Sequence, residues 1–394
     1  MSKSQETPEQ LYAAALALVE QNQPEEALEQ AEKLWGQVQN GSVTEALPAV
    51  NLLGEISIEL GDVDSARAYF EKAVTLDPEG KIPETMGGGA EKFLWLAQLC
   101  EDGGKSSVTW FERGIQALQH EISELEAGRV SGYDDESLLL MRVEKKRKLA
   151  NALCGIVEVY MTDLSWEDDA EARCENLVTQ AMSVEDETSP EVLQTLASVR
   201  LSQERKEDAR SALERSIATW KDLEPEDPAV PDFATRISLA RLLMEAELDH
   251  RAMFVLQRLI QEDDQSVEAW YLGGWCQYLI AERSRNKGAS EQQTNGEANT
   301  EMNLDQDKLN DETLKGSRHW LNKALKLYKL LEYEDERLFE HTKELVAGLD
   351  TVLGPSEDDD AEAAEGAYEQ WDGIEDDDEA NEGEEDEDEE MQDQ

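Results

Sequence analysis

The stretch AVNLLGEISIELGDVDSARAYFEKAVTLDP, residues 49–78, decides the fold of this chain. It contains two apolar-periodic segments joined by Gly61, whose permissive backbone suits a tight turn. Gly54 on the first segment and Ala66 on the second are small enough for two antiparallel helices to approach closely, and Phe70 fills the groove between them. The final proline stops the second helix. The stretch therefore predicts a closely packed helix pair.

The order of large and small residues in this pair is the signature of a tetratricopeptide repeat. One such pair cannot bury its apolar face alone, so neighbours of the same kind must accompany it. The small residue of the second helix recurs at intervals of 39 to 65 residues, which are longer than the usual spacing of about 34. Its positions are Ala27, Ala66, Ser107, Ala170, Ala209, Ala252 and Ser317. The chain is therefore predicted to be all-α, a right-handed superhelical solenoid of about seven helix-turn-helix repeats.

The solenoid is predicted to span residues 1–353 and to end in a capping helix. Repeats are expected near 8–41, 47–80, 90–120, 138–182, 190–223, 233–264 and 266–330, with the cap at 334–353. A polar insertion at 286–315 has too few apolar residues to pack, so a disordered loop is predicted within the seventh repeat. The run Gly87-Gly88-Gly89 is interpreted as a flexible joint before the third repeat.

The segment 354–394 is predicted to be a disordered acidic tail. It contains 22 of the 91 acidic residues and no basic residue. The other 69 acidic residues, against 36 basic ones, give residues 1–353 a net charge of −33 within the total of −55. This field repels nucleic acid and anionic membranes, so neither is expected as a direct partner, and it attracts basic partners. Tyr368, Trp371 and Ile374 interrupt the acidic run, either by chance or as an anchor that docks onto a partner or the solenoid.

Catalytic and metal-binding patterns are absent from the sequence. The four cysteines form no CxxC pair, the four histidines are far apart, and no HExxH, GxSxG or GxGxxG motif occurs. We therefore expect no enzyme activity, no cofactor and no metal. The sequence has no secretory signal and no apolar run long enough for a membrane span, which favours the cytoplasm and nucleus.

A basic run, Lys145, Lys146, Arg147 and Lys148, lies inside a predicted helix. Short runs of this kind act as nuclear-import signals in some proteins. The alternative is a solvated face of the helix, and the sequence leaves both interpretations open.

In a tetratricopeptide solenoid the first helices of the repeats line the concave face, which is the candidate binding site. Helical register assigns to this face Asn51, Glu55, Glu59, Leu94, Gln98, Glu101, Asp102, Asn151, Glu158, Gln194, Arg241, Glu245, Trp270 and Tyr278. The lining is acidic, with apolar and aromatic interruptions. It predicts a groove for an extended basic peptide.

The negative charge of this lining argues against a heat-shock co-chaperone and favours a protein that binds a basic client. Co-chaperones that grip the acidic C-terminus of large heat-shock proteins use a basic clamp, whereas Glu55, Glu101 and Asp102 are acidic. Ribosomal proteins and histones are the two abundant classes of basic client. A histone-binding chaperone and a scaffold subunit of a larger complex remain alternatives to a ribosomal-protein chaperone.

Four features together resemble the fungal assembly chaperones of the fourth large-subunit ribosomal protein. They are LLGEISIELGDVDSARAYFEKAVTLDP, the glycine-rich joint into EKFLWLAQL, the AWYLGGW helix and the acidic end. The resemblance covers essentially the whole chain and implies a dedicated chaperone whose concave face holds the long basic internal loop of that client. It also implies escort to nuclear pre-ribosomes, with a nuclear import receptor reached through or together with the client. Ribosomal RNA, with its denser phosphate array, would then displace the chaperone from the loop.

Overall fold

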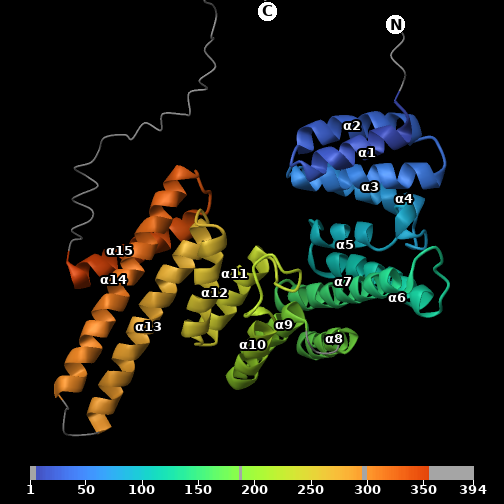
Figure 1. Cartoon of the computed structure of the whole chain (residues 1–394). Helices are drawn as coiled ribbons and strands as arrows, with labels where there is room; N and C mark the ends of the chain where they lie inside the picture. Colours follow the sequence, from blue (N-terminus) through green and yellow to red (C-terminus); the bar gives the residue numbers. More distant parts are fainter. Residues whose placement is uncertain (1–5, 186–188, 295–299, 355–394) are drawn as a thin grey trace, which may run out of the picture.

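The computed structural model describes residues 6–185, 189–294 and 300–354, with side chains throughout except at 287–309. Over these residues the chain forms fifteen α-helices, one short 3₁₀ helix and no strand (Figure 1). The all-α prediction is confirmed. The elements are α1 (Pro8–Glu20), α2 (Pro24–Val38), α3 (Val43–Glu59), α4 (Val63–Leu76), η1 (Glu84–Met86), α5 (Glu91–Gln98), α6 (Gly104–Glu126), α7 (Asp135–Met161), α8 (Ala170–Val184), α9 (Pro190–Ser202), α10 (Lys206–Trp220), α11 (Phe233–Glu245), α12 (Asp249–Glu262), α13 (Val267–Thr294), α14 (Thr300–Leu330) and α15 (Glu336–Leu353).

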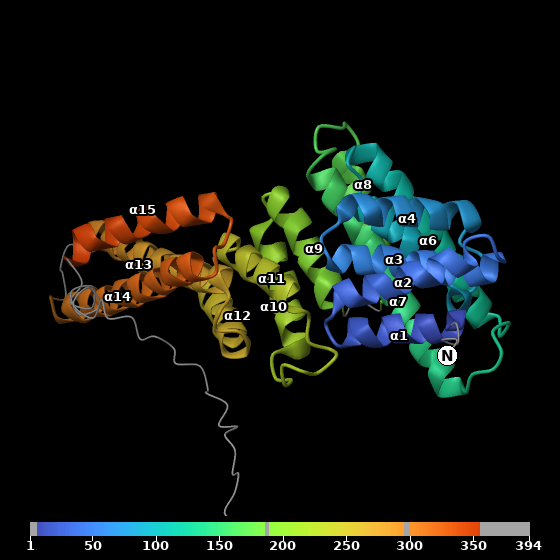
Figure 2. The same cartoon turned by 90° about the horizontal axis from the view of Figure 1, so that it is seen from above.

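The helices pack as consecutive antiparallel pairs, from α1 with α2 to α13 with α14, and α15 packs against the last pair. From α7 onwards the first helices of successive pairs also touch directly, so α7, α9, α11 and α13 form a row. Figures 1 and 2 show the pairs following one another from the N-terminal helices at one side of the molecule to α13–α15 at the other. This is the architecture of a tetratricopeptide solenoid.

Glycines in the first helices let the two helices of a repeat approach each other. A Cβ atom on Gly54 of α3 would lie 2.7 Å from the ring of Phe70 on α4, and Phe70 is 1% exposed. Gly61, in the turn between them, has a φ of +72°. In the seventh repeat, Gly273 of α13 lies against the ring of Trp320 on α14 in the same way. The second and last repeats are therefore built by the same close contact.

Two of the recurring small residues are serines, and their hydroxyl groups join the helices of a repeat. The Ser107 hydroxyl of α6 donates a 2.7 Å hydrogen bond to the Ala97 carbonyl of α5. The Ser317 hydroxyl of α14 donates a 2.7 Å bond to the Gly274 carbonyl of α13. Both serines are buried, so these bonds satisfy polar groups that have lost contact with water.

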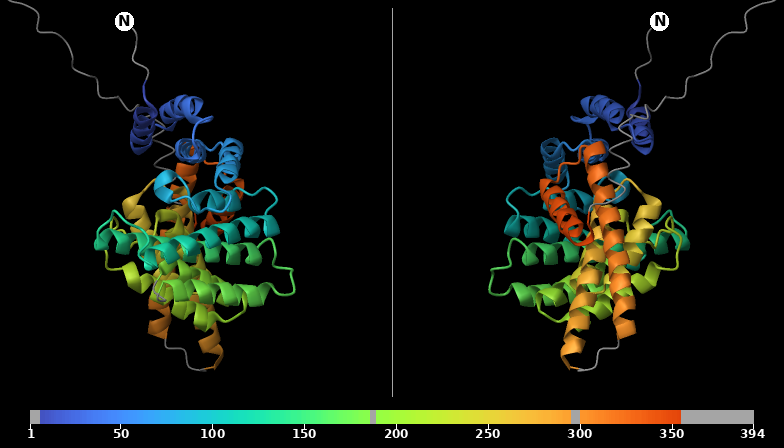
Figure 3. Two further views of the ribbon diagram at one scale, coloured as in Figure 1. Left: turned by 90° about the vertical axis from the view of Figure 1, so that its right-hand side faces the viewer. Right: turned by 90° about the vertical axis from the view of Figure 1, so that its left-hand side faces the viewer.

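The prediction of a disordered loop at 286–315 is wrong. Helix α13 continues to Thr294 and α14 begins at Thr300, so most of the insertion is helical. Figures 1 and 3 show that α13 and α14 extend beyond the neighbouring pairs as a long hairpin. The insertion contains no proline, and good helix formers such as Glu, Gln, Lys and Leu recur in it. A low apolar content therefore did not prevent helix formation.

The run Gly87-Gly88-Gly89 is a packed turn and not the flexible joint that its composition predicted. Gly87 has a φ of +75°. A Cβ atom on it would lie 2.7 Å from the backbone nitrogen of Pro48 on α3. The Asn51 side chain donates a 2.5 Å hydrogen bond to the Gly87 carbonyl. The glycines thus allow the loop after α4 to lie directly against α3.

Helix α15 lies where the sequence predicted a capping helix. It buries Leu338, Thr342 and Leu349. The predicted acidic tail, with Tyr368, Trp371 and Ile374, lies outside the described residues except for Gly354.

Candidate binding surface on the first helices

Charged residues from three first helices lie close together in the N-terminal half, and we call them the Glu55 surface. Glu55 and Glu59 come from α3, Glu91 from α5 and Lys148 from α7. Lys148 forms ion pairs with Glu91 and, at 3.1 Å, with Glu144. The charges of Glu91, Glu59 and Lys148 all act on Glu55. Helices α3, α5 and α7 therefore present these residues toward one shared surface.

Burial and the neighbouring carboxylates raise the pKa of Glu55. Burial is the largest cause, followed by the negative charges of Glu91 and Glu59, while Lys148 opposes the shift. Burial acts to lower the pKa of Lys148, but its contacts with Glu91 and other carboxylates outweigh burial and raise that pKa. An added cation would lower the energy of these crowded carboxylates, so the surface favours positively charged ligands.

A cavity of about 390 Å³ lies where α7, α9 and α11 meet. Four residues that the sequence assigned to the concave face line it: Glu158, Gln194, Arg241 and Glu245. Burial raises the pKa of Glu158, and Arg241 is paired with Glu268 of α13. Gln194 is 6% exposed, and its Nε2 has no hydrogen-bond partner among the described residues. The cavity wall thus combines acidic groups with an unused amide donor.

A second cavity, of about 600 Å³, shares Arg241 and Glu245 with the first and reaches α13. We call the two cavities together the groove. The apolar residues in this part of its wall are Met244, Tyr271, Leu272, Trp275 and Leu279. The Tyr271 hydroxyl is hydrogen-bonded to His341 Nδ1 of α15 at 2.8 Å, and the Trp275 ring lies 5.3 Å from the His341 ring. Burial raises the pKa of Tyr271 to about 12. The groove is therefore acidic toward α7 and aromatic toward α13.

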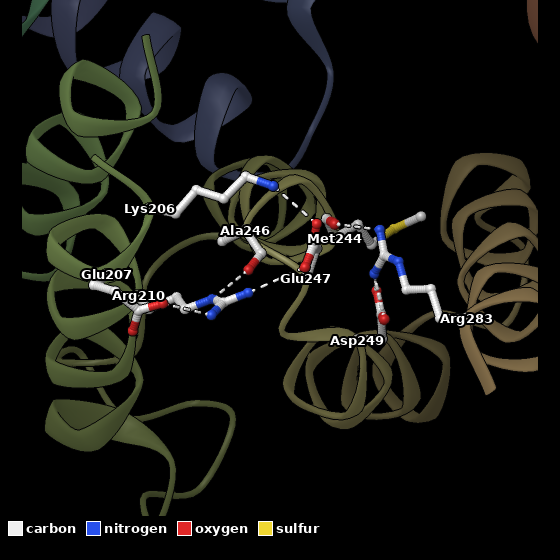
Figure 4. Close-up of polar contacts among 8 residues, drawn as sticks. All are labelled: Lys206, Glu207, Arg210, Met244, Ala246, Glu247, Asp249 and Arg283. Carbon is white, nitrogen blue, oxygen red and sulfur yellow. Dashed lines mark hydrogen bonds and ion pairs between the residues drawn. The ribbon is translucent and has the colours of Figure 1, made fainter. Parts of the chain in front are cut away.

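Ion pairs at the turn between α11 and α12 fix the helices around the groove (Figure 4). Arg210 of α10 donates a 2.7 Å hydrogen bond to the Ala246 carbonyl and lies 3.2 Å from Glu247. Arg283 of α13 pairs with both carboxylate oxygens of Asp249. Arg283 also lines the groove. These contacts hold α10, the α11–α12 turn and α13 in register.

Asn51 and Trp270 lie away from the predicted lining, and helical register explains why. Each lies three residues before the small glycine of its helix, Gly54 or Gly273. This spacing places each of them only about 60° from that glycine around the helix. That side of each helix faces other parts of the fold. The Asn51 side chain donates a hydrogen bond to the loop after η1, and the Trp270 ring lies 4.6 Å from the ring of Trp320.

Leu94 and Glu101 also lie off the predicted face. Leu94 packs against α6. Helix α5 ends at Gln98, so Glu101 and Asp102 lie in the exposed turn that follows. Glu101 forms a 2.8 Å ion pair with Arg67 of α4, a second helix. The sequence placed Glu101 and Asp102 on the concave face because it assumed a longer helix, whereas α5 has only eight residues.

The remaining predicted residues take different positions. Gln98 is exposed at the end of α5, and Tyr278 is half-buried against the core of the C-terminal half. Asn151 is exposed on α7. It shares one face of that helix with Lys148 and Glu158, at spacings of three and seven residues. Asn151 therefore lies between the Glu55 surface and the groove.

Sequence reasoning missed Glu91, Tyr271 and Trp275. In their helices the small residue that contacts the second helix is Ala97 or Gly273. The three missed residues lie about 120° to 200° around the helix from that small residue. A rule that selects the residues turned away from the small residue of the helix would have located all three.

The basic run 145–148 lies in α7 and forms ion pairs with residues of other elements. Lys145 is 4% exposed and lies 2.5 Å from Glu84 and 3.0 Å from Glu121. Lys146 pairs with Glu126, Arg147 with Glu185, and Lys148 with Glu91. Lys145 is buried, whereas Arg147 remains exposed. Besides the two interpretations drawn from the sequence, the run has a structural part, because its ion pairs join α7 to its neighbours.

No group of three or more His, Cys, Asp or Glu residues that could hold a metal ion occurs in the part of the chain that the structure describes. All four cysteines are free thiols, and burial raises the pKa of Cys154 and of Cys276 to about 12. None of the described helices is both long and apolar enough to span a membrane.

Comparisons with known proteins agree with this architecture. A family model described as the ACL4 C-terminal domain matches residues 265–382, and one described as a tetratricopeptide repeat matches 47–79. A protein of Emericella nidulans named probable assembly chaperone of rpl4 is 46% identical over 377 residues, which cover 95% of this chain and 90% of that protein. A Schizosaccharomyces pombe protein of the same name is 33% identical over 319 residues, covering 80% and 84% of the two chains.

A solved structure supports the same relationship. Assembly Chaperone of RpL4 (Acl4), residues 1–338, is 47% identical to this chain. It superposes with a TM-score of 0.64 and covers 72% of this chain and 100% of its own. With these relatives and this all-helical repeat architecture, the chain belongs to the family of assembly chaperones of rpl4.

Proposed function

We propose that this protein is a dedicated chaperone that binds the ribosomal protein rpl4 and shields a basic extended segment of it until ribosome assembly. The relatives are named for that client, and the acidic groove is the observation that carries the binding mode. Glu158, Glu191 and Glu245 line the groove, whereas its Arg241 is already paired with Glu268. Such a wall attracts a peptide rich in lysine and arginine.

Charge also accounts for release without nucleotide hydrolysis. Bound in the groove, the basic side chains of the client are neutralised and kept from nonspecific RNA. At the pre-ribosome, ribosomal RNA offers a denser array of negative charge and competes for the same side chains. On this proposal the protein is a binding protein and not an enzyme. It acts in the cytoplasm and nucleus, and entry into the nucleus uses an import receptor bound through or together with the client.

The test measures the affinity of the full chain for purified rpl4 after charge reversal in the groove. Glu158→Lys with Glu245→Lys should weaken binding by about tenfold or more, because like charges facing each other across an interface cost several kcal/mol. The matched control is Glu71→Lys with Glu214→Lys, which changes net charge equally at exposed positions on the second helices α4 and α10. The control should retain the original affinity.

Equal affinity for both double variants would place the binding site outside the groove. Recovery of core histones in place of rpl4, when the protein is purified from its own cells at low salt, would favour the histone-chaperone alternative. Recovery of a stoichiometric multi-protein assembly would favour the scaffold alternative.

A further inference from the structure

Helix α14 carries a basic stripe on an otherwise strongly acidic chain. Residues 313–331 include five lysines and arginines and no aspartate or glutamate, whereas the chain as a whole has a net charge of −55. We define the basic stripe as Lys315, His319, Lys326 and Lys329, with Lys323 beside it. The positive charge of this helix is opposite to the net negative charge of the chain, so it requires an explanation of its own.

The four residues of the stripe lie on one face of α14. Their positions fall within about 80° of one another around the helix, and all four are exposed. The opposite face is buried, with Leu314, Ser317, Leu321, Ala324 and Leu327 in the core. Lys323 lies with its ammonium 5.9 Å from the Trp270 ring. Within the described part of the chain, Lys315 and Lys329 have no carboxylate partner.

An exposed apolar patch continues the stripe at the end of α14. Leu330 is 73% exposed, Leu331 is 44% exposed and Tyr333 is 37% exposed. Lys326 and Lys329 lie within one helical turn of Leu330. A ligand for the whole surface would therefore combine negative charge with apolar or aromatic side chains.

The last described residue of the chain is fixed beside the same helix. Arg318 of α14 donates a 2.7 Å hydrogen bond to the Gly354 carbonyl and lies 3.1 Å from Asp350 of α15. The acidic segment begins at the next residues. Between 357 and 379 it contains 13 acidic residues, no basic residue, and the hydrophobic residues Tyr368, Trp371 and Ile374.

We propose that residues 355–379 fold back onto α14, with their carboxylates on the basic stripe and Tyr368 and Trp371 on the apolar patch. The chain from Gly354 to Trp371 can span about 56 Å when extended, whereas Arg318 and Leu330 are about 18 Å apart along α14. The family model matches residues 265–382, so one matched unit contains both the stripe and this segment.

Docking of the acidic segment would cover the basic stripe and leave the acidic groove open. The stripe lies on a second helix, whereas the groove is formed by the first helices α7, α9, α11 and α13. Covered by its own carboxylates, the stripe is denied to RNA and to the acidic groove of another copy. Individual exposed ion pairs are weak, but linkage through the same chain gives the segment a high effective concentration at the stripe.

The test uses backbone NMR of the full-length, isotopically labelled chain. In the original protein at low salt, signals from residues near Tyr368–Ile374 should lose intensity relative to those of the last ten residues, because docking makes them tumble with the body. The triple variant Lys315→Glu, Lys326→Glu, Lys329→Glu should restore that intensity. So should salt at about 1 M, where charges are screened beyond about 3 Å.

The matched control is Lys33→Glu, Lys81→Glu, Lys221→Glu, which changes net charge equally at exposed lysines away from α14. It should leave the attenuation unchanged, and circular dichroism checks that both variants keep their helix content. Uniformly sharp signals in the original protein would overturn the proposal, as would equal recovery in both variants. Attenuation that grows with protein concentration, or RNA binding at the stripe while the tail signals remain sharp, would assign the stripe to a second copy or to RNA and would also overturn it.

Discussion

At the scale of single residues, the acidic surface is defined by carboxylates whose surroundings raise their pKa values. Glu55 and Glu158 both have raised pKa values, and burial is the leading cause in each case. An acid whose pKa is raised in the folded state favours folding below its unfolded pKa, and this contribution is lost as the pH rises through the folded pKa. A further cation that binds beside Glu55 therefore favours its ionised form.

The first prediction concerns the link between pH and client binding. Binding of a basic client should lower the pKa of Glu55 and release protons, so affinity should fall as the pH drops into the range just above the ordinary glutamate pKa of about 4.3. Calorimetric titration in buffers of different ionisation enthalpy would measure the released protons. Glu55→Gln should reduce their number and, in the client-free protein, leave the unfolding midpoint at neutral pH unchanged or raised. Proton uptake on binding would contradict the proposed role of Glu55.

A second prediction concerns Lys145, whose side chain is buried between Glu84 and Glu121. Lys145→Ala should lower the free energy of unfolding by about 3–5 kcal/mol, because it leaves partly buried carboxylates without a counter-charge. Urea unfolding would measure the loss. Lys146→Ala is the control: this side chain is 37% exposed and its pairing distance to Glu126 is 3.7 Å. A change within about 0.5 kcal/mol is expected for it, and equal costs for the two variants would refute a structural role specific to Lys145.

A third prediction tests the helix contact that the sequence identified first. Phe70→Ala should cost about 3–5 kcal/mol, because the ring is buried against Gly54 and its removal leaves a cavity. Phe254→Ala, at a side chain that is 37% exposed, should cost much less. Thermal unfolding followed by circular dichroism would compare them. Similar losses would show that burial against the glycine is not what stabilises the repeat.

At the scale of helices, arginines on second helices connect neighbouring repeats in a recurring way. Arg67 of α4 donates to the Leu99 carbonyl at the end of α5 and pairs with Glu101 and Asp64. Arg210 of α10 repeats this pattern, donating to the Ala246 carbonyl at the end of α11 and pairing with Glu247 and Glu207. Each arginine directly follows the small alanine of its helix, Ala66 or Ala209. The guanidinium group thus satisfies a carbonyl that the end of the helix leaves open.

The prediction at this scale is that Arg210→Ala loosens the joint between the fifth and sixth repeats. Its hydrogen bonds involve a charged donor, so about 1.5–3 kcal/mol of stability should be lost. Amide hydrogen exchange should speed up mainly at the end of α11. Arg251→Ala, which removes an exposed arginine from α12, is the matched control and should have little effect. Exchange that rises uniformly through the chain would contradict a local joint.

The helices also show which features of the fold and of the binding surface could be predicted from the sequence. The helix pairs followed from the spacing of small residues, because close packing of two helices demands a small side chain wherever they cross. The lining was less accurate because α5 ends early and because Asn51 and Trp270 lie on the glycine side of their helices. The helical state of most of 286–315 does not follow from apolar periodicity, because this segment has few apolar residues. Ion pairs such as Lys145–Glu121 join residues distant in sequence, so no local pattern could reveal them.

At the scale of the whole molecule, charge is unevenly distributed: residues 1–353 carry a net −33, and the segment 313–331 is basic. The prediction here is that affinity for the basic client falls steeply as salt rises through physiological strength, where exposed charges are screened beyond about 8 Å. Surface plasmon resonance over a salt series would measure it, and the change should appear mainly in the association rate. An affinity that does not depend on salt would mean that the apolar wall at Tyr271 and Trp275 dominates binding.

Over the described residues, the strong helix contacts run within pairs and between neighbouring pairs. Small rotations between successive pairs therefore add up along the chain. The distance between its two ends can change at a low cost in free energy. The span over which the first helices face one another can open or narrow while each local core stays packed. A partner longer or thicker than expected would be met by a slight change of curvature spread over many joints, with no single joint broken.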